Sequence, residues 1–493
     1  MFERVKPLEL ILAEAGATEA GLAGADPLEP THTLKKTLGP ISLMAMGIGA
    51  IIGTGIFVLT GVAAAKYTGP SLTVSFIIAG FVSVFAAMCY SEVVSRVPIA
   101  GSAYTFTYTS LGERFAWIIG WALVLEYALG ASTVSVGWSG YFTTLMSHIG
   151  WQIPVAFTHN PWDTGPSGEA LHGIMNLPAF LVICLIGTLL YRGTQESAMV
   201  NNIIVTLKVC VVLFFIVIGV GHVNQGNWTP YFPFGWGGTL FGAFFVFFAY
   251  IGFDAVSTAA EESVNPKRDM PIGIIGSLAI CTVLYIIVAA ILTGIVSYTH
   301  LNVPQPVAFA IDQIPGMGWA SALISVGAIA GLTTVLLVMM FGQIRVFYAM
   351  SRDGLLPPIF AKLHPKFRTP GLSTVLFTIF IAFLGAFTPI SLLGSLTNMG
   401  TLAAFIFVAI AVPILRTRYP STTGFNVPFG KYFIPIVSAV SAFALIVLGP
   451  LLSTGIGKVF GIPFPWVGFI VWLLIGLPIY YLYGRKHSKL AGS

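Results

Sequence analysis

Apolar residues in this chain form long, nearly uninterrupted runs, and the short segments between them carry most of the charged side chains. A helix needs about 20 apolar residues to cross a bilayer, and runs of that order recur along the whole chain. Twelve spans are predicted, near residues 41–65, 72–95, 116–146, 177–193, 198–221, 238–260, 272–298, 318–347, 372–389, 392–415, 432–456 and 464–484. The hydrophobic pattern therefore predicts an all-α polytopic membrane protein.

The positions of lysine and arginine predict how these helices are oriented. With the N-terminus in the cytoplasm, every Lys and Arg falls on the cytoplasmic side except Lys66 and Lys458, which fall outside, and Lys208, which lies within a span. The longest predicted outer loop, about residues 147–176, contains neither residue type. Because basic residues are retained on the cytoplasmic side, the pattern predicts that both termini lie inside and that the protein crosses the cell membrane many times.

Composition narrows the functional classes. Hydrophobic residues make up 56% of the chain and charged residues 8%, whereas about 25% of a soluble domain is charged, so a soluble protein is excluded. The dispersed basic residues form no nucleic-acid-binding patch. All eight histidines lie at or beyond predicted span ends, and the four cysteines lie within spans. We therefore expect no metal, cofactor or disulfide framework, and the composition disfavours a membrane-embedded enzyme.

The first predicted span contains a glycine-rich stretch, MGIGAIIGTGIF (Met46 to Phe57). Each glycine weakens a helix by about 1 kcal/mol relative to alanine, and a break here would leave backbone N–H groups that bind a carboxylate. Close helix packing through Gly49 and Gly53 is the alternative interpretation. The sixth span has a second weak point at a similar depth, FFAYIGFDA (Phe247 to Ala255). Paired interruptions of this kind mark the binding site of inverted-repeat transporters.

The two weak points predict how the chain is divided, with five spans in each repeat and two further helices. The predicted segments are a cytoplasmic tail (1–40), a first repeat (41–222), a second repeat (237–416), helices 11 and 12 (431–485) and a second cytoplasmic tail (486–493).

Several stretches resemble one known family. They read GIGAIIGTGIF (from Gly47), PIAGSAYTFTYTSLGE (from Pro98), IIGWALVLEYALG (from Ile118), GFDAVSTAAEESVNPKRDMPIGI (from Gly252) and RVFYAMSRDGLLP (from Arg345). Over roughly residues 35–420 the chain resembles the amino acid–polyamine–organocation superfamily and, within it, the cationic amino acid transporters. The resemblance implies a LeuT-like 5+5 inverted repeat, alternating access and L-amino acid substrates. One departure is Ser102 after Gly101, where the family usually has two adjacent glycines.

The resemblance also implies roles for single residues. The substrate carboxylate is expected to meet the Thr54 hydroxyl and the amides of Gly53 and Gly55. The substrate ammonium is expected to meet the backbone carbonyls of Ile51, Phe248 and Ile251. Phe248 matches the aromatic residue that covers the bound substrate and acts as a gate in this family. Without the resemblance, an aromatic side chain in an apolar span would more often be a packing residue.

Three charged residues lie deep within predicted spans: Glu126, Lys208 and Asp254. A charge at a helix centre costs at least ~2.5 kcal/mol, so each residue needs a partner or a function. A static salt bridge between Lys208 and either carboxylate is one interpretation. The resemblance favours another, because sodium-independent relatives place a lysine of helix 5 at the second sodium position. Burial disfavours the charged form of lysine, and Lys208 is therefore predicted to couple transport to protons.

Substrate and transport mode stay open at this level. If Glu126 or Asp254 faces the pocket, a cationic substrate such as arginine, lysine or ornithine is favoured. If both carboxylates are otherwise engaged, the bulk of Met339 or Met340 favours a small neutral substrate such as alanine. The fold serves symport and exchange alike, a channel would need a more polar lining, and the sequence assigns no accessory subunit.

Overall fold

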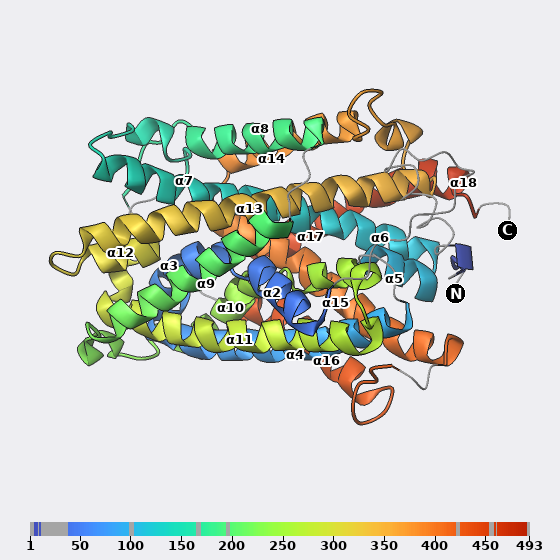
Figure 1. The fold of residues 1–493 in the computed structure, drawn as a ribbon, viewed down its shortest axis with the longest axis horizontal. Coiled ribbons are helices and arrows are strands. Elements are labelled where there is room, and N and C mark those ends of the chain that lie inside the picture. The colour runs from blue at the N-terminus through green and yellow to red at the C-terminus, as the bar shows by residue number, and fades with distance from the viewer. Residues whose placement is uncertain are drawn as a thin grey trace.

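The computed structural model describes residues 4–7, 9–10, 38–97, 103–163, 169–193, 198–420, 424–452, 458–459 and 461–490. Most of its helices run along the long axis of the molecule (Figure 1). Helix α18 (Arg485–His487), near the end of the chain, lies at the same end of the bundle as the first described residues, and α12 (Pro306–Asp312) lies at the opposite end (Figure 1). We call the former the termini end.

Helices occupy the regions in which spans are predicted. They are α2 (Pro40–Ile51), α3 (Thr60–Ala63), α4 (Leu72–Arg96), α6 (Glu113–Val124), α7 (Gly130–His148), α8 (Leu177–Arg192), α9 (Ala198–Val220), α10 (Gly235–Val246), α11 (Pro266–Ile295), α13 (Gly318–Arg352), α14 (Gly371–Phe387), α15 (Ile390–Arg418), α16 (Phe433–Leu452) and α17 (Phe464–Ile479). Helix α5 (Ala103–Ser110) connects α4 and α6.

Shorter elements complete the described part of the chain. The π-helical segments are Gly55–Leu59, Ala64–Thr68, Leu125–Leu129 and Tyr480–Gly484. The 3₁₀ segments are Gly69–Ser71, Val155–Phe157, Gln225–Trp228, Phe247–Tyr250, Phe253–Glu262, Tyr298–His300 and Pro358–Ala361. Strands β1 (Lys458–Val459) and β2 (Ile462–Pro463) pair antiparallel, with Lys458 opposite Pro463 and Val459 opposite Ile462.

The prediction of a helical polytopic membrane protein is confirmed. Within the described residues, eight helical runs are long and apolar enough to cross a membrane, and three shorter apolar helices accompany them. The longest run, Pro40–Arg96, covers the first two predicted spans. The number of twelve spans, their orientation and the division into repeats stay predictions.

The outer faces of several helices carry large exposed apolar side chains. Leu185 on α8, Val217 on α9 and Leu474 on α17 are each exposed by 60% or more. Apolar surfaces of this extent are rare on proteins that face water, and they are typical of helices that face lipid. The side chains of α4, α7 and α15 are in contrast mostly buried, and many of them are small. These helices form the interior wall around the broken helices described below.

Two buried carboxylates at the termini end bind side chains from the N-terminal and C-terminal segments of the chain. Glu113 accepts hydrogen bonds from Arg4 (3.2 Å), from the Tyr480 hydroxyl (2.9 Å) and from the Ser488 hydroxyl. Nearby, Asp353 at the end of α13 is paired with Lys6 at 2.6 Å. Arg4 also donates to the carbonyl of Arg485, which ties the two terminal segments to each other.

A third buried carboxylate, Glu92, lies one turn from the end of α4. It is 0% exposed and is paired with Arg96 on its own helix (3.0 Å) and with Arg416 on α15 (2.6 Å from the Arg416 Nε). The backbone N–H of Val427 also donates to it. Because the Glu92 carboxylate pairs with guanidinium groups on both helices, it holds the C-terminal end of α4 to α15.

Candidate substrate site

The first predicted span (41–65), called helix 1 below, is interrupted where the glycine-rich stretch predicts. Helix α2 ends at Ile51, and Ile52 has an extended backbone (ψ 104°). Residues 52 and 53 are not helical, and the helix resumes at Thr54 before passing into the π-helical segment Gly55–Leu59. The predicted break in helix 1 is confirmed, and it leaves N–H groups at the start of the second half-helix.

The sixth predicted span (238–260), called helix 6 below and beginning with α10, is interrupted as well. After Val246 the α-helix tightens into the 3₁₀ segment Phe247–Tyr250, and Ile251 is extended (ψ 135°). Gly252 has a φ of +118°, a conformation that side-chain-bearing residues rarely adopt. The chain then continues as a 3₁₀ segment from Phe253. The predicted weak point at Gly252 is therefore a real break, and only glycine fits it without strain.

The two breaks lie against each other. A Cβ atom added at Gly55 would stand 2.1 Å from the Ala249 Cα, and one at Gly252 would stand 2.7 Å from the Ala50 carbonyl oxygen. Both distances are far below van der Waals contact, so these glycines permit two backbones to touch. Backbone groups of both interrupted helices therefore lie next to each other at this contact.

The packing interpretation of the glycine-rich stretch is correct for the glycines that precede the break, Gly47 and Gly49. A Cβ at Gly47 would stand 2.4 Å from the Ser277 Oγ on α11, and one at Gly49 would stand 2.2 Å from a Val205 methyl on α9. The two interpretations of this stretch therefore divide by residue. The glycines before the break pack α2 against its neighbours, and Gly55 brings the two breaks together.

The residues predicted to bind an amino acid gather around these breaks. Thr54 is 1% exposed, and among the residues that the structure describes its hydroxyl has no hydrogen-bond partner. The Ile51 carbonyl accepts a hydrogen bond from the Tyr285 hydroxyl at 2.8 Å, and the Phe248 carbonyl accepts one from the N–H of Ile251 at 3.2 Å. Each carbonyl oxygen has a second lone pair, so both keep the capacity to accept another donor.

Helices α7 and α13 contribute apolar walls. A Val335 methyl lies 3.2 Å from the position of a Cβ at Gly53, and the Met339 sulfur lies 2.9 Å from the position of a Cβ at Gly130. Both side chains belong to α13, where the sequence predicts a wall. Met340 is also buried. Val335 therefore limits the room beside the break of helix 1, and Met339 fills the space beside Gly130.

Glu126 lies in the π-helical segment between α6 and α7. It is 1% exposed, and its Oε1 has no hydrogen-bond partner among the described residues. Asp254 of helix 6 and Thr401 of α15 lie close enough to interact with its carboxyl group. Asp254 accepts a hydrogen bond from the N–H of Gly252 at 3.2 Å. Asp254 therefore caps the break in helix 6, and its charge acts on the Glu126 carboxyl group.

Lys208 on α9 is 2% exposed and reaches the first broken helix. Its Nζ donates to the carbonyl oxygen of Gly49, in the last turn of α2, at 2.7 Å. Its methylene stem lies against Gly331 of α13, where an added Cβ would stand 2.9 Å from the Lys208 Cγ. The lysine thus bridges α9, α2 and α13, three residues before the interruption of helix 1.

Three polar residues at the breaks were not singled out from the sequence. The Tyr285 hydroxyl binds the Ile51 carbonyl, and the Tyr141 hydroxyl on α7 donates to the Phe57 carbonyl at 2.6 Å. Asn398 on α15 donates to two carbonyls of helix 6, those of Phe244 and Phe245. A signal existed for Asn398, because an amide in an apolar span is costly unless it is paired. The tyrosines gave no signal among many buried aromatic residues.

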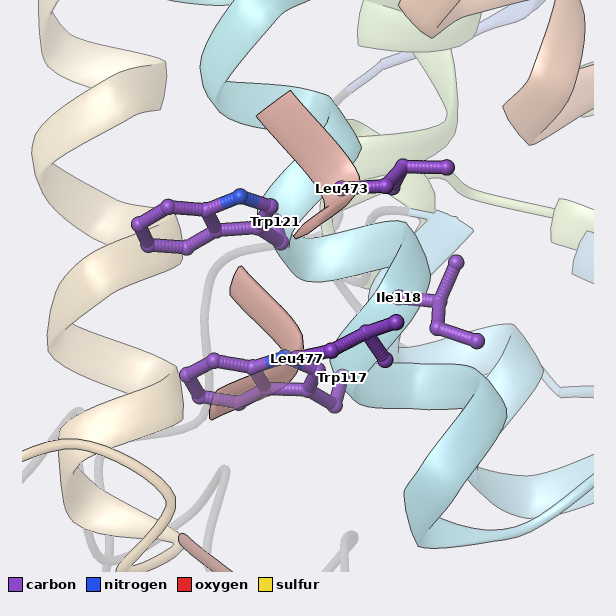
Figure 2. Close-up of a pocket in the computed structure, with 5 residues that line it drawn as sticks. All are labelled: Trp117, Ile118, Trp121, Leu473 and Leu477. Carbon is purple, nitrogen blue, oxygen red and sulfur yellow. The ribbon is translucent and has the colours of Figure 1, made fainter. Parts of the chain in front are cut away.

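A small cavity elsewhere has a different character. It has a volume of about 50 Å³ and is lined by Trp117, Ile118, Trp121, Leu473 and Leu477. Figure 2 shows the two indole rings projecting from the same helix, one above the other, and they are stacked with their centroids 5.9 Å apart. This apolar cavity lies between α6 and α17 and lacks the backbone groups that the breaks present.

Residues 38–480 match the family described as amino acid permease. The chain belongs to the amino acid permease family. It is a membrane transporter of the amino acid–polyamine–organocation superfamily rather than an enzyme, and it lies in the cell membrane. The resemblance drawn from the motifs is therefore confirmed at the level of the family.

Individual relatives of this permease differ in the substrates that their names give. It is 44% identical over 491 residues to the methylthioribose transporter of Bacillus subtilis (strain 168). The aligned region covers 99% of this chain and 98% of that protein. It is 47% identical over 460 residues to the branched-chain amino acid permease of the same organism (93% and 95%). It is 40% identical over 392 residues to the vacuolar cationic amino acid transporter 4 of Arabidopsis thaliana (78% and 64%).

Proposed function

We propose that this permease imports neutral L-amino acids with aliphatic side chains by proton symport and alternating access. The observation that carries the proposal is the direct backbone contact of two helix breaks, with the Thr54 hydroxyl beside them. This hydroxyl has no hydrogen-bond partner among the described residues. In this proposal the chain has the LeuT-like 5+5 inverted repeat, with two further helices and both termini in the cytoplasm.

The substrate backbone is recognised by the protein backbone. The α-carboxylate binds the amides of Gly53 and Gly55 and the Thr54 hydroxyl, where the second half of helix 1 presents the positive end of its dipole. The α-ammonium binds the carbonyls of Ile51, Phe248 and Ile251. Phe248, which is 4% exposed, covers the substrate as a gate.

The side chain of the substrate meets an apolar wall. Val335 supports this assignment, because it limits the space beside Gly53 and offers no polar partner there. The similarity to a permease named for branched-chain amino acids agrees with it. A cationic substrate is the second candidate, favoured by the Glu126 Oε1, which lacks a partner among the described residues.

Coupling is assigned to Lys208. A protonated lysine binds the Gly49 carbonyl through a charge-assisted hydrogen bond, which is stronger than the bond that a neutral amine donates. Loss of the proton weakens the tie between α9 and α2, and so frees the half-helix that precedes the break. Protonation therefore takes the place that sodium binding holds in sodium-coupled transporters of this fold.

Uptake into proteoliposomes tests these assignments. Radiolabelled L-leucine, L-alanine, L-arginine and methylthioribose are offered with and without an inward proton gradient, to wild type and Lys208→Ala. We expect gradient-driven leucine uptake that is lost in the variant. Preferred arginine uptake would transfer the substrate assignment to the cationic class. Uptake that needs amino acid inside the vesicles, or that ignores the gradient, would contradict symport and indicate an exchanger or a facilitator.

A further inference from the structure

We propose that Asn398 on α15 is a positioning residue that fixes the break in helix 6, as an uncharged counterpart of Lys208. The proposal rests on the proposed function only for its transport consequence. Asn398 is 0% exposed, and its Nδ2 donates to the Phe244 carbonyl at 2.7 Å and to the Phe245 carbonyl at 2.9 Å. One side chain thus holds two successive carbonyls of another helix.

The carbonyls of Phe244 and Phe245 lie where helix 6 changes from α-helix to 3₁₀-helix, and such a change alters the hydrogen bonds that carbonyls accept. Helix 6 passes from α-helix to 3₁₀-helix at Val246 and Phe247, so the i→i−4 pattern of hydrogen bonds gives way to an i→i−3 pattern. Phe244 and Phe245 lie in the turn just before this transition. Inside a membrane protein no bulk water is present to satisfy displaced carbonyls, and the Asn398 amide supplies the missing donors.

The orientation of the amide follows from the chemistry of its partners. If the amide were rotated, its Oδ1 would face two carbonyl oxygens, and no hydrogen would lie between them. The bonds therefore require the Nδ2 toward helix 6. The Oδ1 has no partner among the described residues, so the side chain is held by its donor side alone.

The contact has the same form as that of Lys208 on helix 1. In each case a side-chain nitrogen donates to a carbonyl in the last α-helical turn before a break. In each case the donor belongs to the fifth span counted from the broken helix, α9 for helix 1 and α15 for helix 6. The difference is chemical, because an ammonium can release a proton and an amide cannot.

The position of Asn398 connects it to the proposed gate. Phe248 follows Phe245 by one turn, and the residue next to Asn398, Thr397, has its methyl group 3.6 Å from the position of a Cβ at Gly130, beside Met339. A shift of the Phe244–Phe245 turn would therefore move the Phe248 ring and the carbonyls beyond it. Asn398 sets the geometry of that side of the site without touching the substrate.

The test uses Asn398→Leu and Asn398→Asp in the purified full chain, with Ser395→Ala as the matched control. Ser395 is on the same helix and buried, but its hydroxyl binds its own helix at Ser391. The first readout is hydrogen–deuterium exchange of the amides from Phe247 to Gly252, which needs no substrate. We expect Asn398→Leu to speed this exchange at least tenfold and Ser395→Ala to leave it within twofold of wild type.

The second readout is the affinity for L-leucine between pH 5 and pH 8, relative to the control. Aspartate has the shape of asparagine but donates only when protonated, so Asn398→Asp should bind about tenfold more weakly at pH 8 and recover toward the control at pH 5. Unchanged exchange in Asn398→Leu, or a pH-independent affinity ratio for Asn398→Asp, would overturn the proposal. Faster exchange in a protein whose wild type binds no amino acid would uphold the positioning role and reject the proposed function.

Discussion

At each of the two helix breaks a side chain from another helix donates hydrogen bonds to backbone carbonyls, but the two side chains differ in kind. At helix 1 an ammonium, that of Lys208, binds the Gly49 carbonyl, and at helix 6 an amide, that of Asn398, binds the Phe244 and Phe245 carbonyls. Both donors stabilise backbone groups next to a break, but only an ammonium can release a proton. In the proposed function this nearly symmetric arrangement therefore contains one group that can change its charge and one that cannot.

The largest effect is expected from Lys208, the proposed coupling residue. Replacing it with alanine removes a charge-assisted bond of about 3 kcal/mol, so gradient-driven uptake should fall about a hundredfold. Lys208→Arg keeps the charge but cannot release a proton. This control should retain leucine binding and lose acceleration by an inward proton gradient. Gradient-driven uptake by Lys208→Arg would show that coupling lies elsewhere and would break the comparison.

A second effect tests the contact between the breaks. Gly55→Ala would push a methyl group into the backbone of Ala249, and overpacking of this kind costs about 2 kcal/mol. The affinity for leucine, measured by ligand-induced thermal stabilisation, should fall about thirtyfold. Gly53→Ala is the matched control, because its methyl group would meet only a Val335 side chain, and it should cost less than threefold. Equal affinities for the two variants would contradict close contact of the breaks.

Thr54→Val should have a smaller effect. The change removes the hydroxyl that is proposed to donate to the substrate carboxylate and keeps the shape of the side chain. We expect a loss of about 1.5 kcal/mol, or a tenfold increase in KM. The control is Thr60→Val, because the buried Thr60 hydroxyl binds its own helix at Ile56. Uptake kinetics that do not distinguish Thr54→Val from Thr60→Val would remove Thr54 from the site.

The smallest effect is expected for Tyr285→Phe. The Ile51 carbonyl loses one neutral hydrogen bond, which is worth about 1 kcal/mol, so leucine affinity should change by about fivefold. Tyr141→Phe removes a similar bond from Phe57, away from the predicted ammonium ligands. A larger loss of affinity for Tyr141→Phe than for Tyr285→Phe would place the ammonium site elsewhere.

Much of the fold follows from the sequence because hydrophobic runs and glycines report local preferences. The breaks of helices 1 and 6 are predicted correctly, since Gly252 sits at a positive φ and Gly55 at a backbone contact. Hydrogen bonds between helices are not predictable in this way. That Tyr285 reaches Ile51, or that Lys208 reaches Gly49, depends on the rotation of helices far apart in the chain.

The charged residues show the same limit. Glu126, Lys208 and Asp254 stand out because each lies deep in an apolar run, and the structure buries the first two almost completely. No local pattern in the chain indicates Gly49 as the partner of Lys208. Glu92 lies near a predicted span end, where an exposed carboxylate is expected. In the structure it is as buried as Glu126 and is paired with Arg96 and Arg416.

The cluster around Glu113 has a consequence for biosynthesis. Glu113 is made early, whereas its partners Tyr480 and Ser488 leave the ribosome more than 350 residues later. Until then a carboxylate destined for burial lacks two of its donors, and the helices around it are incompletely held. Arrival of the last helix therefore completes the cluster. Nascent chains that stop before residue 480 would display this unfinished charge to the proteases that remove misassembled membrane proteins.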